Sequence, residues 1–403
     1  MKIAYINSVA GYGSTGKLVS MLAKTEGITG KLYYGRKNDT SGCDSFRIIH
    51  NPQFVSHVLW TFVTDDHAMH NTRQTEAMIE DLKQFNPYLV HLHNLHGYYL
   101  DIRPLFSYLK SSGIPVLWTF HDCWPITGHC AHYTSVHCEQ WKTGCKNCPA
   151  LLHYPPTFYA GNIERNYKLK QDLFTSLPVN QLHIVTPSEW LAGEVRQSFL
   201  KYYPIQVIPN GIDQEIFHPV KSSFRNDHHL EGQFVILAVA GNWYKEKGTE
   251  DLVKLSKRLP EGCVLVVVGA KGAFARQLAN DNVVIIPRTE QASQLAEIYS
   301  AADVMINLTQ EDTFPTVNIE AISCGCPVVT YKVGGSAEIA GELAGCSVPY
   351  GDLDGLIQII EKMKEGTISF GKEACRIQAS QYSRTMMLEE YRHIYEELRK
   401  EQR

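Results

Sequence analysis

Short apolar segments alternate with longer segments of helical period along most of the chain. This alternation is typical of parallel α/β sheets, in which helices connect successive strands. Strands are predicted in two series, at 2–8, 31–35, 46–50, 89–93, 116–121, 184–187 and 206–209, and then at 234–240, 264–269, 283–287, 304–308 and 327–331. Two Rossmann-like domains are the simplest architecture that accommodates both series.

The junction between the two series is marked by turn-forming and polar residues. Residues 209–213 read Pro-Asn-Gly-Ile-Asp, and the polar segment 219–232 is predicted to be a linker. The predicted domains are therefore 1–213 and 214–380. The last segment, 381–403, carries apolar residues at helical period and is predicted to form an amphipathic helix that covers apolar surface.

Composition narrows the class of protein. The chain has 403 residues, enough for two substantial cores, and its net charge of −4 does not favour nucleic acid as a partner. No apolar run approaches the ~18 residues that span a bilayer, and the N-terminus runs directly into a predicted strand instead of a signal peptide. We therefore expect a cytoplasmic protein whose eleven cysteines are thiols or metal ligands before they are disulfides.

The most informative block is Asp312-Thr-Phe-Pro-Thr-Val-Asn-Ile-Glu320, a loop that runs into a predicted helix. Free backbone N–H groups at a helix N-terminus suit phosphate or sugar hydroxyls. The two carboxylates that flank this site can accept hydrogen bonds from ribose or sugar hydroxyls. A solvated acidic loop that caps a helix explains the same spacing equally well.

A second candidate is the glycine-rich segment 11–18, directly after the first strand. It fits seven positions of a phosphate-binding P-loop, but Leu18 stands where a Ser or Thr should hold magnesium, so an NTPase is disfavoured. The turn through Gly13 and Gly16 still allows the backbone to approach a diphosphate. The alternative is an ordinary strand-to-helix turn.

Further polar residues follow predicted strands, at the edge where ligands of parallel sheets bind. Asn242, Lys245 and Lys247 come after the first strand of the second domain. In the first domain, His121-Asp122-Cys-Trp-Pro ends one strand, and His93 and His96 end the strand before it. These residues could also be solvated lysines and satisfied core histidines; we expect the histidines to bond acceptor hydroxyls.

Together these motifs resemble the retaining GT-B glycosyltransferases of family four, in particular bacterial enzymes that build capsular and colanic-acid-type polysaccharides. The resemblance implies two Rossmann-like domains facing across a cleft and a C-terminal helix that crosses back to the first domain. It implies that His121, Lys247 and Asp312 are catalytic and that His93 and His96 lie on the acceptor side. The implied donor-binding residues are Gly13, Gly16, Asn242, Gly269, Arg288, Phe314, Pro315, Thr316, Val317 and Glu320. Two residues depart from the family pattern, because Asp312 replaces a glutamate and Asn242 replaces an arginine.

The implied activity is a hexosyltransferase that moves a hexose-type sugar from a UDP- or GDP-sugar to a lipid-linked or soluble glycan acceptor, with retention of configuration. Lys247, the backbone of 314–317 and the 13–16 loop would stabilise the leaving diphosphate, Glu320 would hold the ribose, and Asp312 a hydroxyl of the donor sugar. No Asp-x-Asp motif is present, so no cofactor is expected for catalysis. A degenerate nucleotide-sugar-binding protein and another GT-B activity, such as a nucleotide-sugar epimerase, are the alternatives.

Two segments lie outside this scheme. A polar, turn-rich insertion at about 123–150 contains Cys130, Cys138, Cys145 and Cys148. In a reducing compartment, a structural zinc ion bound by these cysteines is predicted to stabilise the insertion. Unpaired thiols or a disulfide are the alternatives. The apolar segment 54–63 is predicted to be a buried helix, and peripheral contact with the inner face of a membrane is the second interpretation.

Overall fold

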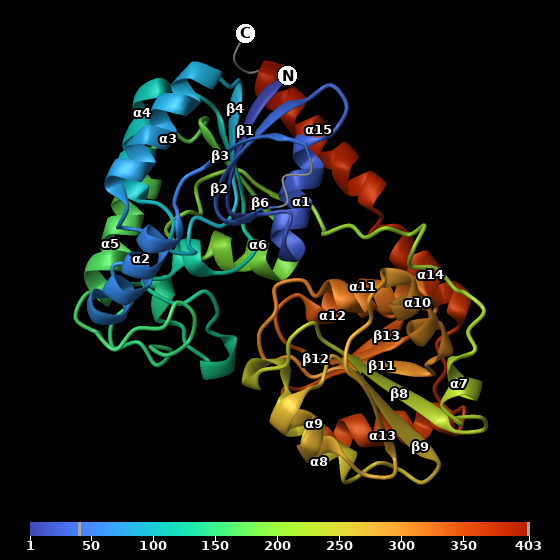
Figure 1. Ribbon diagram of the computed structural model, residues 1–403. Helices are drawn as coiled ribbons and strands as arrows, with labels where there is room; N and C mark the ends of the chain where they lie inside the picture. Colours follow the sequence, from blue (N-terminus) through green and yellow to red (C-terminus); the bar gives the residue numbers. More distant parts are fainter. Residues whose placement is uncertain (39–41, 401–403) are drawn as a thin grey trace. The chain divides into compact units, whose positions relative to one another are not determined.

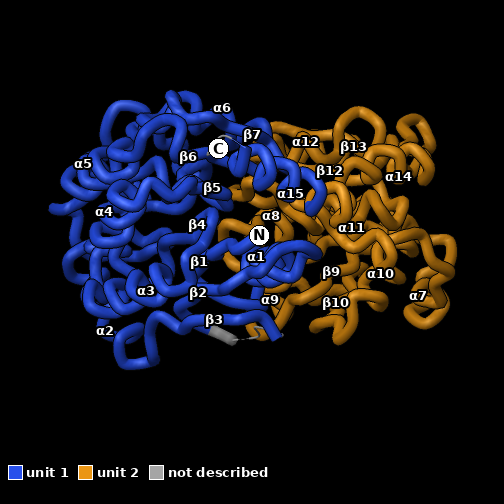
Figure 2. Tube along the Cα trace, turned by 90° about the horizontal axis from the view of Figure 1, so that it is seen from above, with its two compact units in different colours: residues 1–208, 388–403 blue, residues 209–387 orange. Residues whose placement is uncertain are grey.

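The computed structural model describes residues 1–38 and 42–400, and the chain divides into two compact units (Figures 1 and 2). Unit 1 comprises Met1–Ile208 together with Leu388–Arg403, and unit 2 comprises Pro209–Met387. Each unit is a parallel sheet with helices on both faces, so the prediction of two Rossmann-like domains is confirmed. In the described part of the chain, no helix is both long and apolar enough to cross a membrane.

The sheet of unit 1 has the strand order β3-β2-β1-β4-β5-β6-β7, and every neighbouring pair is parallel. Its strands are β1 (Lys2–Ala10), β2 (Thr29–Asn38), β3 (Asp44–Arg47), β4 (Leu89–Leu92), β5 (Val116–Thr119), β6 (Leu182–Thr186) and β7 (Ile205–Val207). Its helices are α1 (Gly13–Ala23), α2 (Asn51–Thr64), α3 (Thr72–Phe85), α4 (Ile102–Ser112), α5 (Ile163–Phe174) and α6 (Glu189–Arg196). Central strands such as β4 are buried at every position, which is why they appear in the sequence as continuous apolar runs.

The C-terminal helix α15 (Arg384–Lys400) returns to unit 1, as the GT-B resemblance predicted. Tyr395 lies within hydrogen-bonding distance of His91, at 2.8 Å between Oη and Nδ1. Tyr391 lies 3.1 Å from the Thr119 hydroxyl, and both tyrosines are almost fully buried. The helix is therefore part of the core of unit 1 and closes over β4 and β5.

The sheet of unit 2 has the strand order β10-β9-β8-β11-β12-β13, again with parallel neighbours throughout. Its strands are β8 (Phe234–Val239), β9 (Cys263–Val268), β10 (Val283–Ile286), β11 (Val304–Asn307), β12 (Val328–Tyr331) and β13 (Gly345–Val348). Its helices are α7 (Phe224–Asp227), α8 (Thr249–Ser256), α9 (Gly272–Leu278), α10 (Ala292–Ala301), α11 (Thr316–Ser323), α12 (Ser336–Ala340), α13 (Leu353–Lys364) and α14 (Lys372–Ser380).

Unit 2 buries both faces of its sheet in two separate apolar cores. Along β8, Val235 and Leu237 belong to one core, and Ile236 and Ala238 belong to the other. In Figure 1, helices α10, α11, α12 and α14 cover one face, and α8, α9 and α13 cover the other. The carboxyl ends of β8, β9, β10, β11 and β12 then lie along one edge, where the loops that carry the candidate site begin.

Two predictions of local structure were wrong. The segment 219–232 is part of unit 2: Phe224 is buried, and the Arg225 guanidinium donates to the Asp303 carboxylate at 2.7 Å. The segment 54–63 belongs to α2, which buries only His57 and Thr61. Aromatic and branched residues suggested burial on every side, but α2 covers the unit with one face and leaves the other exposed.

Candidate active site

The centre of the candidate site is an ion pair between Lys247 and Asp312. The Lys247 ammonium donates to the Asp312 carboxylate with a distance of 2.6 Å between Nζ and Oδ2, and the side chains are 25% and 19% exposed. Burial acts to lower the pKa of Lys247, but Asp312, together with Tyr244 and Glu311, outweighs it, and the pKa is raised above its ordinary value. Lys247 is therefore a fixed positive charge at neutral pH.

Three loops meet at this pair because two glycines allow their backbones to touch. Lys247 lies in the turn η4 (Lys245–Lys247), and the next residue, Gly248, has φ +79°. A Cβ at Gly248 would lie 2.2 Å from the Leu308 carbonyl oxygen, in the loop that follows β11. A Cβ at Gly334, after β12, would lie 1.8 Å from the carbonyl oxygen of Asp312. Only glycine fits at these two contacts, and they bring Lys247 to Asp312.

Asp312 also organises the start of α11. Its second carboxylate oxygen accepts a hydrogen bond from the Phe314 N–H at 3.2 Å. Since Pro315 has no N–H and precedes the helix, Thr316 and Val317 bring the first N–H groups of α11 to this end. The start of the helix and the Lys247 ammonium thus both adjoin Asp312, an arrangement that suits an anionic group.

Glu320 lies on α11 and is partly exposed. The buried Tyr299 hydroxyl, from α10, donates to the Glu320 carboxylate at 3.1 Å between Oη and Oε2. Burial raises the pKa of Tyr299 well above its ordinary value, and the Glu320 carboxylate raises it further. Tyr299 therefore stays a hydrogen-bond donor that orients one oxygen of Glu320.

The other predicted donor-binding residues of unit 2 follow neighbouring strands. Asn242 lies in the exposed loop after β8, and Gly269 follows β9 with φ +90°. A Cβ at Gly269 would lie 2.0 Å from the Ala240 carbonyl oxygen, so these two strand ends touch. Arg288 follows β10 and is exposed. The structure thus places most of the predicted residues of unit 2 after the carboxyl ends of neighbouring strands, and Glu320 within α11.

In unit 1, the predicted glycine loop joins β1 to α1. Gly13 is the first residue of α1 and has φ +67°. Gly16 is buried, and a Cβ there would lie 3.1 Å from a methyl carbon of Val9. The Gly11 N–H donates to the Gly16 carbonyl oxygen at 3.1 Å, which closes the turn.

The predicted histidines of unit 1 also come together. His93 Nδ1 and His121 Nε2 are 3.0 Å apart, with their rings stacked at 5.3 Å. His96 Nε2 donates to the Asp122 carboxylate at 2.6 Å. Burial lowers the pKa of His121 to about 4, and it lowers that of His93 well below the ordinary value. Both rings are therefore neutral at pH 7 and suit hydrogen bonding to hydroxyl groups.

Sequence reasoning missed several partners of these residues. Tyr154 Oη lies 3.3 Å from His96 Nδ1, and the Asn307 side chain donates to the Asn318 side chain at 2.8 Å, which fixes α11 against β11. Both are side-chain contacts between distant segments. A polar Asn at the end of an apolar strand was the available signal for Asn307, whereas nothing in the sequence marked Tyr154.

The cysteine-rich insertion contains only short turns: η1 (Trp124–Ile126), η2 (Thr134–Val136) and η3 (Gln140–Lys142). Cys130, Cys138, Cys145 and Cys148 all line one small cavity there. As the side chains stand, no three His, Cys, Asp or Glu residues within 1–38 and 42–400 are arranged to hold a metal ion.

Two parallel α/β units, a C-terminal helix that returns to unit 1, and a cationic helix-terminus site at the strand ends of unit 2 define a glycosyltransferase of the GT-B type. Comparison with known protein families supports this class. Residues 220–381 match the family model "Glycosyl transferases group 1", and residues 40–216 match "Glycosyltransferase Family 4". Together the two matches and the fold support a glycosyltransferase of the family-four type with the GT-B fold.

The relatives that it resembles are bacterial. The chain is 27% identical over 326 residues to the putative colanic acid biosynthesis glycosyl transferase WcaC of Escherichia coli strain K12, covering 77% of each chain. It is 34% identical over 160 residues to the D-inositol 3-phosphate glycosyltransferase of Segniliparus rotundus, covering 36% of this chain and 35% of the relative.

Solved structures share the fold. Sucrose-phosphate synthase from Thermosynechococcus elongatus superposes with a TM-score of 0.71 at 17% identity, covering 99% of each chain. HepE from Anabaena, in complex with UDP, superposes with a TM-score of 0.67 at 13% identity, covering 98% of this chain and all of that one (100%).

Proposed function

We propose that this glycosyltransferase moves a hexose-type sugar from a UDP- or GDP-sugar to a glycan acceptor, with retention of configuration, in the synthesis of a cell-surface polysaccharide. The similarity to a colanic acid glycosyltransferase supports the pathway class. The HepE structures, one of them with UDP-glucose bound, support a nucleotide sugar as the donor. The observation that carries the proposal is the Lys247–Asp312 pair beside the N-terminus of α11.

The chemistry follows from where charge develops. When the glycosidic bond to the nucleotide breaks, negative charge grows on the leaving diphosphate, and fixed donors aimed at it lower the barrier. Lys247 and the N–H groups of Thr316 and Val317 are such donors. Because they are held by the backbone contacts at Gly248 and Gly334, they need little reorganisation during the reaction.

The two carboxylates have separate tasks in this proposal. Glu320, held by Tyr299, accepts hydrogen bonds from the ribose hydroxyls. Asp312 accepts one from a hydroxyl of the donor sugar while it orients Lys247. Since neither carboxylate is needed as a nucleophile, the acceptor attacks on the face that the diphosphate leaves, and the diphosphate takes the acceptor proton. Retention then needs no covalent intermediate and no metal ion.

A donor panel tests the proposal. Thermal unfolding of the full chain is measured with UDP-, GDP- and ADP-sugars, each with and without EDTA. A sugar nucleotide that binds should raise the unfolding temperature, because ligand at 100 times Kd adds about 2.7 kcal/mol. The same donor should be hydrolysed slowly without acceptor, with or without EDTA. Stabilisation without hydrolysis would identify a degenerate binding protein, and no stabilisation by any donor would overturn the proposal.

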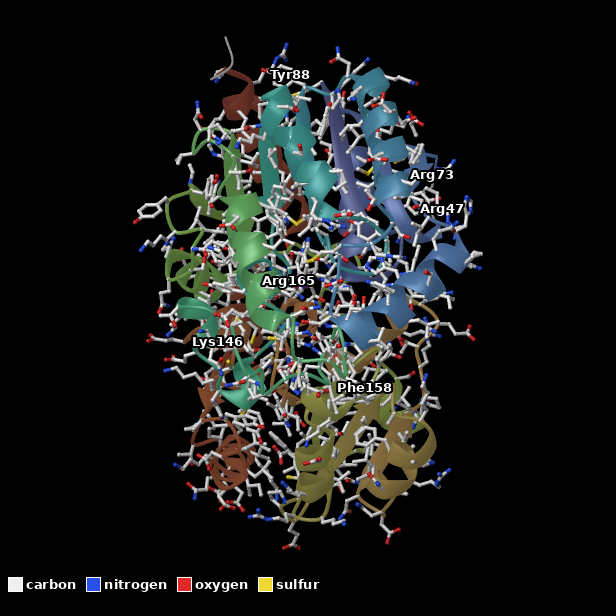
Figure 3. The ribbon with its side chains drawn as sticks, turned by 90° about the vertical axis from the view of Figure 1, so that its left-hand side faces the viewer. Arg47, Arg73, Tyr88, Lys146, Phe158 and Arg165 are labelled. Atoms are coloured by element: carbon white, nitrogen blue, oxygen red, sulfur yellow. The ribbon has the colours of Figure 1, made fainter. Side chains whose placement is uncertain are left out.

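We further propose that the acceptor is lipid-linked, because unit 1 exposes an apolar surface. This α2 apolar patch comprises Val55, Leu59, Trp60, Val63, Leu152, Phe158 and Tyr159, which are between 46% and 78% exposed. Phe158 stacks on Phe62 of α2 with the ring centres 5.5 Å apart, so the loop and the helix form one surface. Figure 3 shows this side of unit 1, where Phe158, Lys146 and Arg165 are labelled.

An apolar face with exposed aromatic residues suits shallow contact with a membrane interface. Flotation with anionic vesicles should recover the wild-type chain, whereas a Leu59→Ser, Trp60→Ser, Phe158→Ser variant should stay behind. Tyr202→Ser is the matched control, because Tyr202 is 73% exposed elsewhere on unit 1. Equal flotation of the folded triple variant would exclude the patch as the membrane contact. If the wild-type chain did not float with the vesicles, the peripheral location at a membrane face would be excluded.

A further inference from the structure

The cysteine-rich insertion gathers five metal-ligating side chains around one cavity. Cys130, Cys138, Cys145, Cys148 and His129 all line it, and its volume is about 10 Å³, near that of a single water-sized sphere. Such a space excludes an organic ligand but admits an ion.

Two of the thiols accept hydrogen bonds from backbone N–H groups. Cys130 and Cys148 lie close enough that each shifts the pKa of the other, raising that of Cys130 and lowering that of Cys148. The Gly128 N–H donates to Cys145 Sγ at 3.2 Å, and the Ala150 N–H donates to Cys148 Sγ at 3.4 Å. Backbone N–H groups directed at sulfur favour thiolates, which are the form that binds metal.

His129 supplies an independent observation. It is 2% exposed, and its Nδ1 donates to the buried Asp65 carboxylate at 2.5 Å. Among the described residues, its other ring nitrogen, Nε2, is buried and has no hydrogen-bond partner. A carboxylate that fixes one ring nitrogen and leaves the other for an ion is the usual arrangement around metal-binding histidines. An orphaned buried nitrogen otherwise costs stability.

A buried lysine lies near the cysteines of the cavity, and burial lowers its pKa to about 7, so it is only partly charged unless an anionic group compensates it. The Lys170 ammonium is almost fully buried, and it donates to the carbonyl oxygens of Trp124 and Thr127 at 2.9 and 3.0 Å. Buried cations are retained where negative charge compensates them. Three thiolates around a divalent ion carry a net negative charge, and Lys170 would help to neutralise it.

We propose that this cavity binds a structural Zn²⁺ ion through the thiolates of Cys130, Cys145 and Cys148, with either Cys138 or His129 as the fourth ligand. Tetrahedral coordination by three or four cysteines is the typical structural zinc site. Among the described residues no three such side chains stand in a metal-binding arrangement, so binding requires rotation about the Cα–Cβ bonds to bring the sulfur atoms together. The proposal does not depend on which sugar the enzyme transfers.

Metal analysis of the full chain, expressed in zinc-supplemented medium and purified with a reducing agent, tests the proposal. We expect about one Zn²⁺ per chain. Cys130→Ser, Cys145→Ser and Cys148→Ser should each lose the ion, whereas Cys346→Ser should retain it, because Cys346 lies in β13 of unit 2. Retention of zinc by all three loop variants would overturn the proposal.

If the loop variants do not fold, measurements on the wild-type chain still test whether the cavity binds zinc. Stepwise mercurial modification should release zinc to a colorimetric chelator in parallel with the loss of the loop thiols. A metal-free chain in which all four thiols react freely, or a Cys130–Cys148 disulfide found by mass spectrometry, would refute the site.

The fourth ligand is identified by comparing Cys138→Ser with His129→Ala. Replacement of zinc by Co²⁺ gives an absorption spectrum that reports the number of thiolates. One variant should keep the wild-type cobalt spectrum, and the other should lose zinc. If both keep zinc and an unchanged cobalt spectrum, a four-ligand centre of this composition is excluded.

Discussion

Replacing Lys247 by methionine tests the electrostatic role of the candidate site. Methionine keeps most of the length and apolar surface of lysine and removes the charge. Lys245 provides a matched control two residues away on the same turn: its ammonium lies 3.7 Å from Glu250, and both side chains are at least 60% exposed. Lys245→Met therefore removes the same charge from the same segment without touching the Asp312 loop.

The expected magnitude follows from the geometry. Lys247 is 25% exposed and fixed at 2.6 Å from Asp312, so it acts as a preorganised donor. Removing one such donor typically costs about 2.7–4 kcal/mol of transition-state stabilisation, or roughly 10²–10³ in kcat. Because diphosphate charge is greater in the transition state than in the bound donor, kcat should fall more than donor affinity. Lys245→Met should change kcat by less than about twofold, as exposed pairs contribute little.

The assay combines steady-state donor turnover, calorimetry with the nucleoside diphosphate, and thermal unfolding. Loss of Lys247 also leaves the partly buried Asp312 carboxylate without its partner, so some destabilisation is expected. The double variant Lys247→Met, Asp312→Asn separates the two effects, because it should recover stability but not kcat. Recovery of kcat in the double variant would show that Lys247 only neutralises Asp312. An effect on KM alone would limit Lys247 to ground-state binding.

Three further predictions address other parts of the molecule. Glu320→Gln should weaken donor binding by roughly 10- to 150-fold, the equivalent of about 1.5–3 kcal/mol for a charge-assisted bond. Glu342 is exposed, and Glu342→Gln should leave donor binding unchanged. If calorimetry finds the same donor affinity in Glu320→Gln as in wild type, the ribose contact is rejected. Gly334→Ala should destabilise unit 2 by roughly 2–4 kcal/mol, because the φ of +55° at Gly334 and the Asp312 carbonyl oxygen both exclude a Cβ. Chemical denaturation measures this loss, and Gly371→Ala, as the control, should be nearly neutral. Burial lowers the folded-state pKa of His121 to about 4 and that of His57 to about 3. The free energy of unfolding should therefore fall as the pH drops below about 6.5, the pKa of histidine in the unfolded chain, and keep falling towards pH 4. A flat profile over this range would contradict the burial of these histidines as neutral rings.

The fold could be predicted because its strands are buried on both faces. Runs such as β9 and β12 are apolar at nearly every position, and their alternation with helices specifies parallel α/β units. The strand β13 was not predicted because Gly345 and Ser347 interrupt its apolar run. The exposed face of α2 was not predicted, because amino-acid type alone does not show which side of an apolar helix lacks a covering element.

The site could be predicted one motif at a time, but its contacts could not. Tyr299 and Glu320 lie on different helices, and the short distance between them follows from the packing of α10 against α11. Tyr154 reaches His96 from the irregular loop before α5, where neither periodicity nor a motif constrains the side chain. Motifs identify residues that follow strands, whereas partners depend on how loops fold over the sheet edge.

The Lys247–Asp312 pair shows what this difference means for chemistry. Taken separately, Lys247 suggested a cation for the diphosphate and Asp312 an acceptor for a sugar hydroxyl. At 2.6 Å each is the other's counter-ion, so neither charge is fully available in the chain without donor. A donor that offers both a diphosphate and a hydroxyl gives Lys247 an anion and Asp312 a hydrogen-bond donor at the same time, while Asp312 continues to orient Lys247. A nucleoside diphosphate without its sugar supplies only the first partner. The pair therefore favours the intact nucleotide sugar over the product, and comparison of the two affinities in wild type and in Asp312→Asn would measure that preference. If the ratio of the two affinities is unchanged by the substitution, the pair does not discriminate between donor and product.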